Sequence, residues 1–89
     1  ARTQAPLPAG AVAVSAPMLG TFYRAPSPAE PPFVQAGQRV AAGDPVGLVE
    51  VMKLFNTVNA PVAGTVLAIP AENGALVEYG EVLVVIQPA

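Results

Sequence analysis

The side-chain amine of Lys53, the only lysine among 89 residues, is the group in this sequence best suited to covalent chemistry. A lysine amine can be acylated once it is deprotonated, and acylation removes its positive charge. Apolar Met52 and Leu54 flank Lys53, where polar residues would be expected around an exposed charge. A lone surface lysine is ordinarily only a solubilising charge, but exposed apolar neighbours indicate a site that another protein recognises. We therefore expect Lys53 to be a modification site.

Other kinds of catalysis are hard to assemble from this composition. The sequence has no histidine and no cysteine, so it lacks the usual general base, the commonest metal ligands and any disulfide. No glycine-rich segment has the spacing of a phosphate-binding loop. We expect the carboxylates to be solvated charges, mostly in or beside turns: Asp44, Glu50, Glu72, Glu78 and Glu81. Neither a catalytic residue nor a metal site is predicted.

The charge pattern argues against nucleic-acid binding, and the short apolar runs argue against membrane insertion. The net charge is −2, and the four basic residues are too scattered to form a basic face: Arg2, Arg24, Arg39 and Lys53. The sequence is 53% hydrophobic, but Gly, Pro or charged residues interrupt its apolar runs well before the roughly 20 residues of a membrane span. We expect neither a nucleic acid nor a membrane as a partner.

An apolar segment, Val46 to Asn59, surrounds Lys53 and must position it. Burying an unpaired ammonium group is costly, so we expect this segment to fold back as a β-hairpin with the charge at its tip. The two-residue turn would be Met52-Lys53, although tight hairpin turns usually carry Asn or Gly. The flanking residues do not alternate cleanly between polar and apolar, so the position of the charge is the main evidence for the hairpin.

Short Val-rich segments separated by Gly and Pro, with no helical period, predict one small all-β domain. The second half of the chain repeats the first: residues 14–21 match 58–65 at an offset of 44, and 37–49 match 74–86 at an offset of 37. Each half has an Ala-Pro-x-x-Gly turn signal followed by Gly-x-x-Val-x-x-Gly. Two copies of one four-strand unit, related by an approximate two-fold axis, would form a closed or nearly closed sandwich.

The repeat also predicts where the chain ends lie relative to Lys53. The two offsets place its counterparts at positions 9 and 90, so under two-fold symmetry both termini lie at the pole opposite the hairpin tip. Residues 1–11 are rich in Ala and Pro, which favour an extended, semi-rigid conformation, and we interpret them as a linker remnant. Because the sequence starts at Ala1 rather than Met, we expect it to be a piece of a larger protein.

The first copy of the repeat carries seven extra residues between Gly20 and Gly37. The excess falls in 22–33, a segment that contains four of the eleven prolines. Proline removes backbone donors and stiffens a loop, so we expect a projection that stands off the sheet rather than another strand. The alternative interpretation is a tolerated surface insertion, with its aromatic residues packed beneath it.

The motif Glu50-Val51-Met52-Lys53-Leu54 resembles the attachment site of biotinyl domains. Among those domains, the segment from Ser15 to Pro28 is similar to the biotin carboxyl carrier proteins of bacterial and plastid acetyl-CoA carboxylases, which have a protruding thumb where this chain has its excess. The resemblance covers residues 12–87, which it marks as a carrier domain. It implies a flattened β-barrel of two four-stranded sheets.

The resemblance also implies the site residues. Lys53 would carry covalent biotin, and its flanking residues would be read by a biotin protein ligase: Glu50, Val51, Met52 and Leu54. The thumb against the biotin ring would be Ala25, Pro26, Ser27, Pro28, Ala29, Glu30, Pro31 and Pro32. The family usually has Ala at the position of Val51 and often has Thr at the position of Ala25.

The function implied by the resemblance is that of a carrier without catalysis of its own. Biotin on Lys53 would receive a carboxyl group from a biotin carboxylase and deliver it to a carboxyltransferase that makes malonyl-CoA for fatty acid synthesis. Tethering would raise the effective concentration of the prosthetic group at both sites. The implied location is the bacterial cytoplasm or the plastid stroma.

Three alternatives stay open on the sequence. A lipoyl domain of a 2-oxo acid dehydrogenase complex has a similar fold, but its lysine commonly lies in an Asp-Lys-Ala setting. The carrier domains of other biotin-dependent carboxylases usually lack the insertion. An unmodified β-sandwich could use the same apolar tip to bind a partner.

Overall fold

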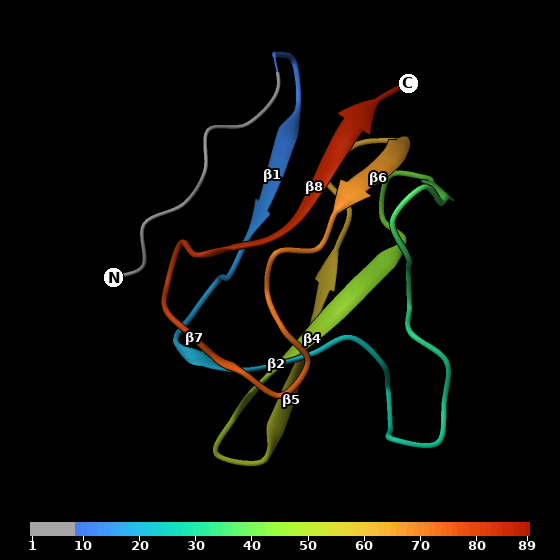
Figure 1. The fold of residues 1–89 in the computed structure, drawn as a ribbon. Coiled ribbons are helices and arrows are strands. Elements are labelled where there is room, and N and C mark those ends of the chain that lie inside the picture. The colour runs from blue at the N-terminus through green and yellow to red at the C-terminus, as the bar shows by residue number, and fades with distance from the viewer. Residues whose placement is uncertain (1–8) are drawn as a thin grey trace.

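The computed structural model describes residues 9–89, which form eight β-strands and no helix (Figure 1). The strands are β1 Val12–Ser15, β2 Gly20–Tyr23, β3 Arg39–Val40, β4 Pro45–Val51, β5 Leu54–Asn59, β6 Gly64–Ala68, β7 Leu76–Val77 and β8 Val82–Pro88. The predicted all-β fold is confirmed. The predicted linker, residues 1–11, lies for the most part outside the described residues.

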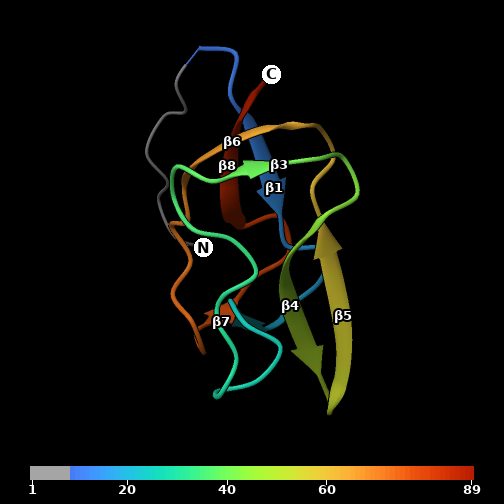
Figure 2. The same ribbon diagram turned by 90° about the vertical axis from the view of Figure 1, so that its right-hand side faces the viewer.

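The strands form two four-stranded antiparallel sheets, with the orders β1-β8-β6-β3 and β5-β4-β2-β7. Pairing each of β1 to β4 with the strand four places later converts one order into the other, which is the two-fold relation that the sequence repeat predicts. Each sheet takes two strands from each half of the chain, so the two copies interlock (Figure 2). The molecule measures 35 × 29 × 17 Å, so the sandwich is flattened.

The two-fold relation extends to the hydrogen bonds of the turns. The Gly43 amide donates to the Ala60 carbonyl at 2.8 Å, and the Gly80 amide donates to the Ala16 carbonyl at 2.9 Å. Gly43 and Gly80 have φ of 92° and 83°, in the left-handed region that glycine adopts without steric cost. Both members of the sequence repeat therefore specify the same local structure.

Two turn carboxylates have a structural role at equivalent positions. An Asp44 side-chain oxygen accepts from the Ala41 amide at 2.9 Å, and a Glu81 side-chain oxygen accepts from the Glu78 amide at 3.1 Å. Side-chain oxygens that accept from a nearby backbone amide stabilise tight turns. Glu50, in contrast, lies within β4 rather than in a turn.

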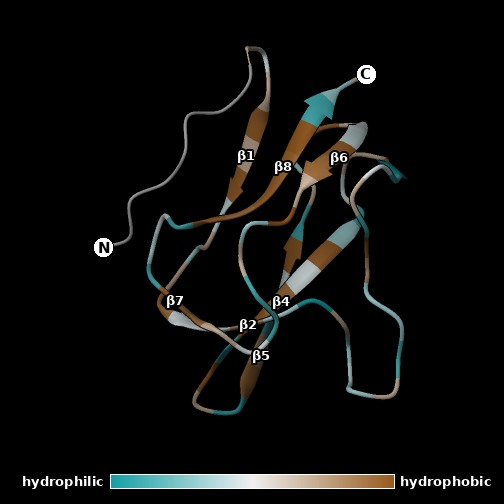
Figure 3. Ribbon diagram, in the orientation of Figure 1, coloured by the Kyte–Doolittle hydropathy of each residue, from teal (hydrophilic) through white to brown (hydrophobic). Residues whose placement is uncertain are grey.

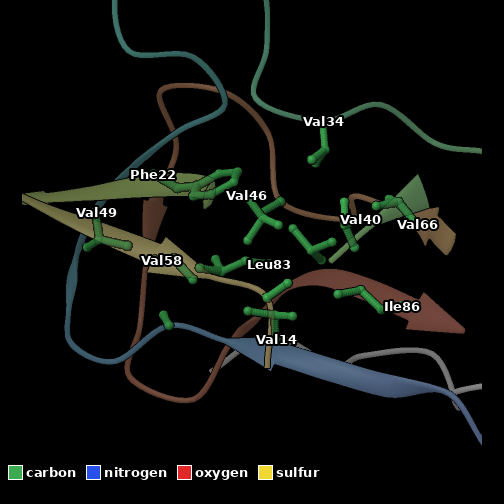
Figure 4. Packing of buried hydrophobic residues seen from close by; sticks show 14 of the residues in the cluster. Val14, Phe22, Val34, Val40, Val46, Val49, Val58, Val66, Leu83 and Ile86 are labelled. Atoms are coloured by element: carbon green, nitrogen blue, oxygen red, sulfur yellow. The ribbon is translucent and has the colours of Figure 1, made fainter. Parts of the chain in front are cut away.

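The core lies between the two sheets and consists mainly of β-branched side chains (Figure 4). Such residues fit the pleated surface of a sheet. The largest side chains with almost no exposed surface are Phe22, Leu83, Ile86, Val46, Val49, Val66, Val77 and Val84. Figure 3 shows hydrophobic stretches along β1 and β8, and another on β5 beside the hairpin tip. The stretch on β5 is not part of the core, because Leu54 and Phe55 are exposed.

Two glycines allow neighbouring strands to approach closely. A Cβ at Gly20 would lie 2.6 Å from the Glu50 carbonyl oxygen, and a Cβ at Gly64 would collide with the Gln87 carbonyl oxygen. Glu50 and Gln87 are equivalent positions at the repeat offset of 37. The close approach is therefore present once in each sheet.

The β4-β5 hairpin tip lies at one end of the molecule, and β1 begins and β8 ends at the opposite end (Figures 1 and 2). The ends of the described chain thus lie on the side that the repeat predicts. Among the described residues, no helix is long and apolar enough to cross a membrane.

Candidate functional site: the Lys53 turn and the groove beside it

Met52 and Lys53 form the two-residue turn of the β4-β5 hairpin. The last pairs before the turn are Glu50 with Phe55 and Val51 with Leu54. Met52 has φ of 51° and Lys53 has φ of 66°. Positive φ at both central residues is the geometry of a type I′ turn, whose twist matches that of the flanking strands. The predicted hairpin and its turn are confirmed.

The turn is strained because neither of its central residues is glycine or asparagine. Met52 and Lys53 are the only non-glycine residues with positive φ in 9–89. The left-handed conformation costs an L-residue roughly 1–2 kcal/mol. Residues held in such conformations cluster at functional sites, where the strain is maintained by the surrounding structure. The strain therefore points independently to the same two residues as the sequence.

The side chains at the tip are exposed together. Met52 is 90% exposed and Leu54 is 70% exposed, and Lys53 is also exposed. Val51, in contrast, is half-buried and packs against the core, where its Cγ2 would lie 3.0 Å from a Cβ at Gly20. The tip presents one amine between two apolar side chains, while Val51 faces the interior.

Glu50 contacts an aromatic residue of the neighbouring strand. The Tyr23 hydroxyl donates to Glu50 Oε1 at 3.2 Å, and the Tyr23 ring lies 6.3 Å from the Phe55 ring at an angle of 48°. Partial burial raises the pKa of the Tyr23 hydroxyl above its ordinary value, and the hydrogen bond to Glu50 and the negative charge of Glu50 raise it further. The hydrogen bond to Glu50 therefore favours the protonated form of Tyr23.

The connection from β2 to β3 contains a projecting loop. Its base is closed by a hydrogen bond from the Phe33 amide to the Arg24 carbonyl at 2.7 Å. Within it, the Glu30 amide donates to the Ser27 carbonyl at 3.1 Å. Residues 26–32 are exposed. The loop, which we call the thumb, projects from the same end of the molecule as the hairpin tip (Figures 1 and 2).

A groove of about 580 Å³ lies between the thumb and the outer face of the second sheet. From the thumb it is lined by Ala25, Pro26, Ser27, Pro28, Glu30 and Pro32, and from the rest of the chain by Tyr23, Arg24, Leu48, Phe55 and Asn73. Ala29 and Pro31 are not part of the lining. The volume falls in the range of about 300–1,000 Å³ that small-molecule sites occupy. Phe55 lies two residues after Lys53, so the hairpin that carries the amine also forms part of the groove lining.

The five lining residues outside the thumb were not predicted as site residues. Tyr23 and Leu48 are directly paired on neighbouring strands, so their side chains share one face. A correct strand alignment would have placed them together, but Asn73 lies on a distant turn that no local pattern connects to the thumb. Among the described residues, no three His, Cys, Asp or Glu side chains gather as a metal site would require.

Comparisons with known proteins place this arrangement in a family. The family described as "biotin-requiring enzyme" matches residues 12–86. The biotin carboxyl carrier protein of acetyl-CoA carboxylase from Nostoc sp. is 48% identical over 75 residues, which are 84% of this chain and 41% of that protein. The protein of the same name from Haemophilus influenzae is 49% identical over 74 residues, 83% of this chain and 48% of that protein. This chain spans less than half of either relative.

Solved structures show the same fold. A single-chain, multi-domain long-chain acyl-CoA carboxylase matches with a TM-score of 0.81 at 23% identity, over 97% of this chain and 8% of that one. The urea carboxylase of Kluyveromyces lactis matches with a TM-score of 0.75 at 29% identity, over 96% of this chain and 7% of that one. With a family match over residues 12–86 and relatives near half identity, this chain belongs to the biotin-requiring enzyme family.

Proposed function

We propose that this chain is a biotin carboxyl carrier domain in which Lys53 carries biotin through an amide bond. The observation that supports this most strongly is the exposed lysine in a strained turn, flanked by exposed Met52 and Leu54, in a member of a biotin-requiring family. The deprotonated Nζ of Lys53 attacks the carboxyl carbon of biotin, which a ligase has activated. The N–C bond forms as the C–O bond to the activating group breaks, that group leaves with its oxygen, and the lysine loses its positive charge. The chain itself acts as a carrier and not as a catalyst.

The residues of the hairpin tip and of the groove fit biotin. Lys53 is exposed and therefore accessible for acylation, and the groove, which includes Phe55 of the same hairpin, is lined mostly by apolar side chains with a few polar groups for orientation. Biotin, when bound, supplies the ureido nitrogen that holds the carboxyl group. Tyr23, Phe55 and Leu48 offer an apolar floor beneath such a ring. The thumb residues that line the groove form its opposite wall: Ala25, Pro26, Ser27, Pro28, Glu30 and Pro32.

The flanking residues are proposed to guide the ligase. Met52 and Leu54 present apolar surface on either side of the amine, and Glu50 is held by Tyr23 at the side of the hairpin. A biotin protein ligase that bound this tip would cover the exposed apolar surface, which favours association. Val51 packs inward, so we assign it to holding the hairpin rather than to contact with the ligase.

The partners proposed for the whole protein follow from its relatives. Proteins named biotin carboxyl carrier protein of acetyl-CoA carboxylase have this domain as less than half of their length. We propose that biotin on Lys53 moves between a biotin carboxylase and the carboxyltransferase of such an enzyme, supporting malonyl-CoA formation and fatty acid synthesis. Relatives include bacterial and chloroplastic proteins, so the proposed location is the bacterial cytoplasm or the plastid stroma. The names of these relatives favour biotin over a lipoyl group.

Intact-mass measurement tests the proposal. The chain is expressed together with a biotin protein ligase, and the wild type is expected to gain the mass of one biotinyl group. Lys53→Arg keeps the positive charge and is expected to gain none. Arg39→Lys is the matched control, because it adds a second exposed lysine away from the tip and should still gain only one group.

Two results would contradict the proposal. One is the absence of added mass on the wild-type chain although the ligase modifies a known acceptor in the same cells. The other is added mass on Lys53→Arg, which would place the modification elsewhere.

A further inference from the structure

Arg24, at the base of the thumb, is bound to a second connection of the fold. Its guanidinium donates to two backbone carbonyls. Nε and Nη2 donate to the Ala71 carbonyl at 3.1 and 2.7 Å, and Nη2 also donates to the Ile69 carbonyl at 3.0 Å. Its backbone amide donates to Oδ1 of Asn73 at 2.8 Å. Charge-assisted bonds of this kind are stronger than neutral ones, and the guanidinium is half-buried.

The acceptors belong to a firmly held part of the molecule. Ile69, Ala71 and Asn73 lie in the β6-β7 connection, which is the two-fold equivalent of the connection that contains the thumb. Ala71 is 2% exposed, Ile69 packs against the core, and the Gly74 amide donates to the Phe22 carbonyl at 2.7 Å. Arg24 therefore joins the long connection to its short counterpart, which is fixed in the core.

Arg24 links the base of the thumb to two parts of the chain, Phe33 at the end of the thumb and the β6-β7 connection. The carbonyl of Arg24 accepts from the Phe33 amide at 2.7 Å, which closes the loop, while its side chain and amide hold the β6-β7 connection. Arg24 and Asn73 also line the groove together with Tyr23 and Ala25. A change in the position of Arg24 would therefore move the thumb relative to the floor of the groove.

We infer that Arg24 and Asn73 are positioning residues that fasten the thumb to the β6-β7 connection, so that the groove is already formed before any group is attached to Lys53. The inference rests on the proposed function only in taking the groove as the place where the attached ring lies. The consequence is that the ring meets a preformed wall and does not have to order a loose loop, which would cost affinity.

Hydrogen exchange of the unmodified chain tests the fastening directly. The readout is the Phe33 amide, and the Gly43 amide, which bonds to Ala60 in a distant turn, is the internal reference. Arg24→Ala and Asn73→Ala are expected to speed Phe33 exchange about tenfold or more and to leave Gly43 unchanged. Arg39→Ala is the matched control, because it removes an exposed arginine of the same charge outside the groove.

Conservative variants separate positioning from general stability. Asn73→Asp retains a side-chain oxygen for the Arg24 amide and is expected to keep the wild-type exchange rate. Arg24→Lys retains the charge but lacks the planar fork that reaches two carbonyls, so its rate is expected between those of wild type and Arg24→Ala. Asn73→Ala removes only an exposed side chain, so a folded variant is available even where Arg24→Ala unfolds.

The second readout uses the biotinylated chain. Backbone amide chemical shifts are compared between the unmodified and modified forms, and the wild type is expected to show differences both at the hairpin tip and in residues 25–32. In Asn73→Ala the thumb differences should fall by at least half, while those of Leu54 persist. A Phe33 exchange rate within twofold of wild type in both alanine variants would overturn the inference. Failure of the wild-type chain to accept biotin would instead overturn the proposed function, since the exchange experiment needs no modification.

Discussion

Glu50 and Lys53 lie three residues apart on one hairpin but have different surroundings. Lys53 is exposed at a turn, whereas Glu50 accepts a hydrogen bond from Tyr23 on the neighbouring strand. The carboxylate is thus held on the side of the hairpin that faces the groove residues Tyr23 and Phe55. At this scale the site consists of one free amine and one oriented carboxylate.

The contact between Tyr23 and Glu50 predicts a titration result. Glu50→Gln removes the negative charge and weakens the acceptor, so the raised pKa of the Tyr23 hydroxyl should fall toward its ordinary value of 10.0. A ¹³C NMR titration of the Tyr23 ring measures this. Glu72→Gln, which changes the charge equally at an exposed position, should leave the curve unchanged. Identical Tyr23 curves for wild type and Glu50→Gln would contradict the contact between the two side chains.

The raised pKa of the Tyr23 hydroxyl also determines in which direction the stability of the fold changes with pH. A hydroxyl whose pKa is higher in the folded than in the unfolded state adds stability that is fully present below the unfolded value, near 10. That stability is lost as pH rises through the folded pKa. The free energy of unfolding should therefore fall above pH 10, and it should fall less in Glu50→Gln than in wild type.

At the scale of elements, the β4-β5 hairpin keeps two residues in an unfavourable conformation. Lys53→Gly removes the Cβ that makes positive φ costly, so we expect it to be more stable than Lys53→Arg by about 0.5–1 kcal/mol. Urea unfolding measures the difference. Thr57→Gly, at an exposed position within β5, is the control and should lower stability, since glycine there only adds unfolded-state entropy. A Lys53→Gly variant less stable than Lys53→Arg would contradict the strain.

The close approaches at Gly20 and Gly64 predict a second comparison between elements. An alanine at either position places a methyl group against the backbone of the neighbouring strand, and we expect each to cost about 1–3 kcal/mol. Gly43→Ala has open space but a φ of 92°, so it is expected to cost about 1–2 kcal/mol through backbone conformation alone. Thermal unfolding of the three variants measures the loss of stability in each. Equal tolerance of alanine at Gly20 and at an exposed strand position would rule out the steric contact.

At the scale of the whole molecule, the two-fold relation shows which part of the chain the fold can lose. Nine residues, 25–33, separate Arg24 from Val34, and only two, 69–70, separate the equivalent Ala68 from Ala71. Val34 and Ala71 are both buried, so the connections return to the core at matching points. The seven additional residues therefore lie outside the repeated framework of the sandwich, and we expect the fold to form without them.

Deleting residues 26–32 tests whether the fold forms without the seven extra residues. The remaining two-residue connection has the length of its counterpart, so the variant is expected to stay folded, with a cooperative unfolding transition and the β-sheet amide shifts of wild type outside the β2-β3 connection. The expected loss is about 1–2 kcal/mol, corresponding to the hydrogen bonds at the thumb base. A variant that loses the cooperative transition would show that the thumb supports the fold.

The sequence alone determined the parts of this protein that depend on local chemistry. A single lysine in an apolar segment predicted the exposed turn, because an unpaired charge cannot be buried cheaply. The two repeat offsets predicted equivalent strands, and β3 and β4 map onto β7 and β8 residue for residue at an offset of 37. The roles of the thumb and of the residues flanking Lys53 stay predictions for the experiments above.

Only the tertiary structure decided how the two copies interlock and what surrounds the thumb. Each sheet combines strands from both halves, so Tyr23 contacts Phe55 and Arg24 reaches the Ala71 carbonyl 47 residues away. No local pattern encodes such contacts, because they depend on strand pairing between segments that are distant in sequence. The groove and the contacts at its base therefore follow from the assembled sandwich, whereas the exposed amine of Lys53 could be predicted from its neighbours in the chain.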